Sequence, residues 1–265
     1  MDGGSTINFD LLNAEAAEHS HFLQGLWHFR WAFDLCHRLS DIYIELRRLA
    51  VEAEGIPSDV VLKDSFDLRL AFCATCQCAL FQGFMSLVRG HSSEAFPSLR
   101  KAIEMCAFAI QLRQCPEDST VWRAVSAITG EIDEVAYGRY QERFKVPKIL
   151  ESRRNPATQL THLYRDYDFC SKLQHASSIG LANTFRGLPM GAVSYFDDAA
   201  GDLPFIRALK MTIIVHARII RILTANAFII AESQSEPLML ALEDVERELR
   251  SRLEQLWAKN PPAVA

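Results

Sequence analysis

The sequence predicts an all-α protein, a multi-helix bundle around a central apolar helix. Apolar residues recur at helical spacing along most of the chain, alternating strand patterns are nearly absent, and turn signals divide the long periodic segments. The chain has 265 residues, of which 49% are hydrophobic and 23% charged, so it is large enough to bury a substantial core. We expect about seven to nine helices in a single domain (residues 9–259), between a flexible N-terminus (residues 1–8) and a flexible tail (residues 260–265).

Turn signals set the boundaries of the predicted helices. Gly55 suits a helix C-terminus, Pro57 prevents the helix from continuing, and Ser58 is suited to cap the next one. Ser92 or Ser93 is a second N-cap, in a tight connection. The expected helices cover about residues 9–54, 58–89, 92–114, 119–129, 132–144, 156–177, 203–233 and 236–259.

The central helix is expected to begin at Leu203 and to contain the most apolar run of the chain, Thr212 to Ala231. This run is long enough to span a bilayer. However, His216, Arg218 and Asn226 fall within it, and the cost of inserting such side chains into lipid argues against a membrane span. We therefore interpret it as a buried core helix and expect no membrane association.

Composition favours a cytoplasmic protein. The net charge of −5 shows no global basic excess of the kind that indicates nucleic-acid binding, although local patches are not excluded by it. The seven cysteines are odd in number and mostly lie in apolar, helical segments, which suits a reducing compartment better than a disulfide framework. The first ten residues, MDGGSTINFD, lack the apolar stretch of a signal peptide.

A polar ridge is predicted near the end of the helix at residues 156–177. At 100° per residue, Tyr164, Asp168, Ser171 and His175 fall within about 60° of one another. One interpretation is the ordinary solvent boundary of a helix. The other is a pocket wall, in which His175 keeps its proton near a helix C-terminus and binds an anion or acts as a general acid.

A long connection, from Ser178 to Pro204, follows this ridge. It contains four glycines and two prolines. Connections of this length are uncommon inside compact domains and are often functional. We expect this segment to cover the pocket.

Arg100 and Glu104 form a second polar group, one helical turn apart. Phe96 and Phe108 share their ridge, so the two charges lie between aromatic side chains. A partly buried pair of this kind needs further partners. It is either a structural ion pair that locks two helices together or the polar floor of the pocket that His175 closes.

A basic stripe is predicted on the central helix. Arg207, Lys210, Arg218 and Arg221 lie within about 80° of one another, and His216 points the opposite way. The stripe could hold an anionic ligand, or it could pair with an acidic helix such as the one containing ALEDVERELRSRLEQ (residues 241–255).

Metal-binding patterns are weak. Cys73, Cys76 and Cys78 lie in a continuous helical pattern without a second CxxC, and we expect neither a metal nor another cofactor. The run DDAAGD (Asp197 to Asp202) resembles the Asp-rich magnesium motif of all-helical terpenoid synthases, which keeps a metal-dependent enzyme as an alternative.

The last predicted helix, residues 236–259, carries a coiled-coil-like apolar seam. Its members are Leu238, Leu242, Val245, Leu249 and Leu256. The seam either packs on the body of the domain or forms a homodimer.

Two blocks resemble a known group of proteins. They are FMSLVRGHSSEAFPSLRKAIEMCAFAIQL (residues 84–112) and YRDYDFCSKLQHAS (residues 164–177). Both are similar to segments of uncharacterised bacterial all-helical proteins related to the HEPN-like superfamily, several of which serve in toxin–antitoxin or antiphage systems. The resemblance implies a helical fold that binds an anionic ligand, RNA or a protein partner. It also implies a role in stress response or phage defence.

The resemblance also bears on catalysis. Active HEPN ribonucleases carry an Arg followed, after roughly four to six residues, by a His. Arg30 and His37 match that spacing, whereas nine residues separate Arg165 from His175. The departure in the second block disfavours nuclease activity there.

Three functional hypotheses follow. The first is a soluble HEPN-like protein that binds an anionic ligand, RNA or a protein partner. The second is an enzyme, either a divergent ribonuclease that uses His175 or His37 or a metal-dependent enzyme that uses the Asp197–Asp202 loop. The third is a dimeric scaffold without catalysis. The candidate catalytic residues are His175, Arg100, Glu104, Tyr164 and Asp168.

Overall fold

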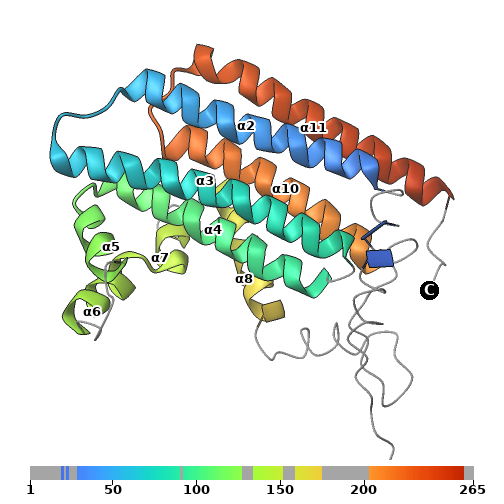
Figure 1. Cartoon of the computed structure of the whole chain (residues 1–265), viewed down its shortest axis with the longest axis horizontal. Coiled ribbons are helices and arrows are strands. Elements are labelled where there is room, and N and C mark those ends of the chain that lie inside the picture. The colour runs from blue at the N-terminus through green and yellow to red at the C-terminus, as the bar shows by residue number, and fades with distance from the viewer. Residues whose placement is uncertain are drawn as a thin grey trace, which may run out of the picture.

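The computed structural model describes residues 19–20, 22–23, 29–89, 92–126, 134–151, 159–174 and 203–259. All regular elements in these ranges are helices, which confirms the predicted all-α multi-helix bundle (Figure 1). The helices are α2 (Arg30–Glu54), α3 (Val60–Val88), α4 (Ser92–Gln114), α5 (Asp118–Ser126), α6 (Glu134–Arg143), α7 (Val146–Glu151), α8 (Gln159–Gln174), α10 (Leu203–Asn226) and α11 (Glu232–Lys259).

The boundary between α2 and α3 follows the turn signals closely. Gly55 has a φ of 66°, a conformation that glycine adopts without steric cost, and its N–H donates to the carbonyl of Val51. The N-cap of α3 is Asp59 rather than the predicted Ser58. Its Oδ1 accepts a hydrogen bond of 2.9 Å from the N–H of Leu62, so the carboxylate also lies at the positive end of the helix dipole.

Two predictions about element boundaries were wrong. The helix expected at residues 203–233 ends at Asn226, and α11 begins at Glu232 rather than Glu236 because the N–H groups of Gln234 and Ser235 bond the carbonyl of Ala231. The short helix α7 was not predicted, since six residues are too few to show a period.

The central position predicted for the apolar helix is confirmed. α10 packs against α2, α3, α4, α8 and α11. Figure 1 shows α2 and α11 side by side on one side of the bundle, and α5 to α8 beyond α4 on the other. Because α10 contacts so many helices, most of its side chains are buried, His216 among them.

The apolar seam of α11 is buried within the same chain. Leu238, Leu242, Val245 and Leu249 are almost completely covered, and α11 packs against α2 and α10. The interpretation of the seam as packing on the body of the domain therefore holds. A homodimer through residues 236–259 would have to use the polar outer face of this helix.

Within the described residues, one helix is long and apolar enough to cross a membrane by length and composition, namely α3. Half of its apolar window is buried inside the bundle. A core helix meets the same criteria, so this finding alone does not place α3 in a lipid bilayer.

Close packing of α3 on α4 forms the largest contact between two helices. Small buried residues line it, and Gly83 of α3 approaches α4 so closely that an added Cβ would lie 3.4 Å from the Cβ of Ser98. A methyl group fits at this distance and a larger side chain does not. Gly83 therefore sets how near the two helices come.

We predict opposite effects for two substitutions at Gly83. Gly83→Ala should leave the free energy of unfolding unchanged or raise it by up to about 1 kcal/mol, because alanine favours the helix. Gly83→Leu should lower it by about 1 to 3 kcal/mol through overpacking. Urea unfolding followed by circular dichroism measures both. Gly138 on α6 has open space around its Cα, so Gly138→Leu is the matched control and should not destabilise. A stable Gly83→Leu variant would contradict the close approach.

Candidate functional site

The ion pair between Arg100 and Glu104 is the core of the candidate site. Both residues lie on α4, and Arg100 Nε donates to Glu104 Oε1 over 2.9 Å. The side chains are 23% and 27% exposed, so the pair is neither a free surface contact nor a buried one. Both groups remain accessible to a ligand from one side.

Helix α8 supplies aromatic side chains beside this pair. The guanidinium carbon of Arg100 lies 5.5 Å from the ring centre of Tyr167, a cation–π contact. One turn earlier on α4, Phe96 meets Phe169 edge to face with ring centres 6.0 Å apart. Helices α4 and α8 thus pack against each other in the fold.

Helix α6 adds further rings near Glu104 and Phe108 of α4. Tyr140 lies 6.5 Å from Phe108 of α4, and burial followed by the negative charge of Glu104 raises the pKa of its hydroxyl. Tyr137, with 39% of its surface exposed, stacks on Tyr140 at an interplanar angle of 22°. Arg100, Glu104, Tyr137, Tyr140 and Tyr167 together are called the Arg100 cluster below.

Cys170 of α8 lies beneath the cluster but is not a nucleophile. Burial, with a smaller contribution from Asp166, raises its pKa to about 12, although Arg100 acts in the opposite direction. The thiol therefore stays protonated at neutral pH, and a protonated thiol is unreactive.

The described members of the predicted polar ridge are not part of the cluster. Asp168 forms an exposed ion pair of 2.6 Å with Lys172 on its own helix. Tyr164 is partly buried against the core, and the buried Oγ of Ser171 has no hydrogen-bond partner among the residues that the structure describes. His175 lies outside the described residues, as do the Asp197–Asp202 loop and most of the 178–204 segment, so the predicted cover of the pocket is not described.

The basic stripe of α10 is divided by ion pairs. Arg218 pairs with Asp166 of α8, and Arg221 forms a bidentate pair with Glu246 of α11, with Nη2 2.9 Å from Oε2. These contacts follow the alternative in which the stripe pairs with other helices. Arg207 is exposed and Lys210 half-buried, so the four cations do not act as one anion site.

Sequence reasoning missed Asp166 and the tyrosines of the cluster. Burial raises the pKa of Asp166, while Arg218 and then His162 act to lower it. No spacing within α8 reports its ion pair, because Arg218 lies 52 residues later on α10. The contact of the Tyr167 ring with Arg100 likewise joins two helices.

A second polar pair lies deep in the core. The hydroxyl of Tyr43 on α2 and Nδ1 of His216 on α10 are 2.9 Å apart, and both residues are fully buried. Burial lowers the pKa of His216 to about 3, and within the described part of the chain its Nε2 has no hydrogen-bond partner. The imidazole is therefore neutral and closed to solvent, which suits a structural role.

In the described part of the chain, no group of three or more His, Cys, Asp or Glu side chains is placed to hold a metal ion. Cys73 and Cys76 of the CxxC pattern are buried, and burial raises the pKa of both thiols. The alternative ribonuclease pair, Arg30 and His37, is exposed on α2, where the His37 ring packs against Phe81 with 5.8 Å between centres.

The chain was compared with protein-family models, with curated proteins and with solved structures. No protein-family model, no curated protein and no solved structure matches the chain.

The His216 environment predicts loss of stability in acid. In the unfolded chain the imidazole titrates near 6.5, and in the folded protein near 3. Between these values only the unfolded state gains the proton, so the stabilising contribution is complete above about pH 6.5 and is lost as the pH falls. The loss at about pH 4.5 relative to about pH 7 should be roughly 2 to 3 kcal/mol.

Urea unfolding at the two pH values tests this assignment. His216→Gln keeps a hydrogen-bonding partner for Tyr43 without a titrating ring, and it should remove that part of the pH dependence. His37→Gln, at an exposed histidine, serves as the control and should retain it. Equal pH dependence in the wild type and His216→Gln would show that His216 is not the responsible group.

Proposed function

We propose that this protein is a non-catalytic RNA-binding protein of HEPN-like type, and that the Arg100 cluster is its binding site. The observation that carries the proposal is the position of Arg100 over the Tyr167 ring, beside Glu104, whose charge also acts on Tyr140 of α6.

The chemistry of the cluster suits unpaired bases. Aromatic rings stack on the face of any base, and an arginine over a ring adds a second flat surface. Tyr137 offers the most exposed ring, and its contact with Tyr140 keeps it in a fixed orientation. Glu104 can accept hydrogen bonds from an amino group on a base edge, a readout that single-stranded RNA permits because its bases are accessible.

Exposed cations that could contact a phosphate backbone lie on helices of the cluster or next to them in the chain. Lys101 follows Arg100 on α4, and Arg139, Lys145 and Lys148 lie on or next to α6 and α7. All four are exposed. They supply the local positive charge that the overall charge of −5 does not.

One feature favours binding over cleavage at the cluster. The spacing of Arg165 and His175 departs from that of active HEPN ribonucleases, and the pair that matches it, Arg30 and His37, lies on α2, outside the cluster. A role in stress response or phage defence is part of this proposal through the HEPN-like resemblance alone.

Fluorescence anisotropy with a labelled, mixed-sequence single-stranded RNA of about 15 nucleotides tests the proposal. Arg100→Gln and Tyr137→Leu should each weaken binding by about tenfold, because one removes a cation and the other a stacking surface. Tyr137→Phe keeps the ring and should bind within about twofold of the wild type.

Lys63→Gln is the matched control for charge, because Lys63 is exposed on α3, a helix that contributes no residue to the cluster. The absence of saturable binding by the wild type would refute the proposal, as would equal losses for Lys63→Gln and Arg100→Gln. Electrophoresis of the same RNA after incubation should show intact strands. Shortened products that disappear with His37→Ala or His175→Ala would instead support the ribonuclease alternative.

A further inference from the structure

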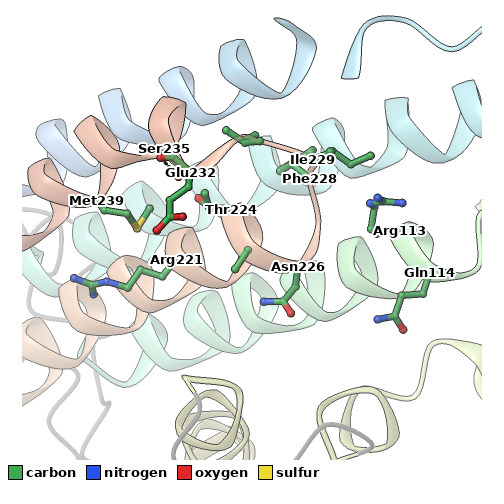
Figure 2. A pocket seen from close by; sticks show the side chains of 12 residues that line it. Arg113, Gln114, Arg221, Thr224, Asn226, Phe228, Ile229, Glu232, Ser235 and Met239 are labelled. Atoms are coloured by element: carbon green, nitrogen blue, oxygen red, sulfur yellow. Dashed lines mark hydrogen bonds between the residues drawn. The ribbon is translucent and has the colours of Figure 1, made fainter. Parts of the chain in front are cut away.

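A surface depression of about 720 Å³ lies where the C-terminal ends of α4 and α10 meet the start of α11. Figure 2 shows it from close by. It lies apart from the Arg100 cluster and shares no lining residue with it. The following inference is therefore independent of the proposed RNA-binding function.

The floor of this depression is held by two polar contacts, of which the one made by Arg69 is buried. Glu54 Oε1 accepts a hydrogen bond of 2.8 Å from the N–H of Ile229, and Arg69 donates to the carbonyl of Ala227. Phe228, between these two residues, is buried against the core. The side of the α10–α11 connection that faces the core is thus held in place by Glu54, Arg69 and Phe228. Its solvent-facing side forms a preformed surface.

Two charged side chains lie on opposite sides of the depression, with Asn226 between them (Figure 2). They are Arg113 at the end of α4 and Glu232 at the start of α11. Within the part of the chain that the structure describes, neither side chain takes part in an ion pair. Arg221, which also lines the depression, is already paired with Glu246.

Exposed apolar side chains accompany these charges. Ile229 is 54% exposed, and Ile56 and Val60 on the neighbouring α2–α3 connection are 72% and 73% exposed. Ile56 follows Glu54 by two residues, and because Glu54 bonds to Ile229, the two connections lie together at one end of the bundle. Figure 1 shows both connections at this end. Clustered exposed apolar residues of this kind mark interaction sites.

We propose that this face is a two-fold homodimer interface. A surface with an unpaired cation on one side, an unpaired carboxylate on the other and apolar residues beside them is complementary to a second copy of itself. Rotation by 180° about an axis that passes between these two side chains brings Arg113 of each copy opposite Glu232 of the other. This surface differs from the apolar seam of α11, which is already buried within one chain.

Charge reversal tests the interface directly. Sedimentation velocity over a range of concentrations should show a dimer for the wild type. Arg113→Glu and Glu232→Arg should each weaken the dimer by about tenfold or more, because each creates two like-charge contacts per dimer. The double variant Arg113→Glu/Glu232→Arg should restore it. An equimolar mixture of the two single variants should form a heterodimer, since one carries two carboxylates and the other two cations.

Control variants at distant exposed sites are Arg139→Glu on α6 and Glu243→Arg on α11, and both should dimerise like the wild type. Ile229→Asp tests the apolar centre and should also abolish the dimer. Three results would overturn the proposal: a monomer at every concentration, a dimer that both charge reversals leave unchanged, or a double variant that fails to reassociate. The first would leave the face to a different partner, and the second would move the interface to another surface.

Discussion

The buried ion pair between Arg69 and Glu54 is the interaction on which the arrangement of this bundle depends most. The two side chains are 6% and 7% exposed and form two hydrogen bonds of 2.9 and 3.0 Å. The guanidinium lies between the rings of Phe66 and Phe228, 5.2 and 5.6 Å from their centres. Charges removed from water at this depth need further hydrogen bonds beyond those of the pair itself. Here Arg69 Nη1 also donates to the carbonyl of Ala227, and Glu54 Oε1 accepts from the N–H of Ile229, while Arg69 Nε has no hydrogen-bond partner among the described residues.

This pair joins three segments that are far apart in the chain. It ties the end of α2 to the middle of α3 and to the connection between α10 and α11. Because that connection sets where α11 begins, the pair also determines how the α11 seam meets α2 and α10. Helix α4 packs against both α3 and α10, and it also contains Arg100 and Glu104 of the Arg100 cluster. The floor of the proposed interface and the position of the proposed RNA site thus both rest on the packing of α3, α4 and α10.

Local signals were enough to predict much of the fold. Gly55 and Pro57 ended a helix as expected, and the period of Leu238, Leu242 and Val245 correctly identified the buried face of α11. The end of α10 was missed, because residues 227–231 contain no glycine or proline and continue the apolar pattern. There the helix ends for a tertiary reason, namely the burial of Phe228 and the hydrogen bonds from Arg69 and to Glu54.

In the candidate site too, local spacing predicted the residues of one helix but not the contacts between helices. Arg100 and Glu104 were identified because they are one turn apart on a single helix. Their neighbours Tyr140 and Tyr167 come from other helices, and no spacing within one helix reports such a contact. The partner of Arg69 was not predictable for the same reason, since Glu54 lies fifteen residues earlier on a separate helix. The stripe on α10 had the correct geometry, but its cations pair with Asp166 and Glu246 from α8 and α11.

A double-mutant cycle on Arg69 and Glu54 tests the central claim most directly. The free energy of unfolding in urea is measured for the wild type, Arg69→Met, Glu54→Gln and the double variant. Each single change should cost about 3 to 5 kcal/mol, because it leaves one buried charge without its counterion. The double variant should cost less than the sum by at least about 1.5 kcal/mol. Additive losses, or single losses below about 1 kcal/mol, would show that the pair does not hold this end of the bundle together.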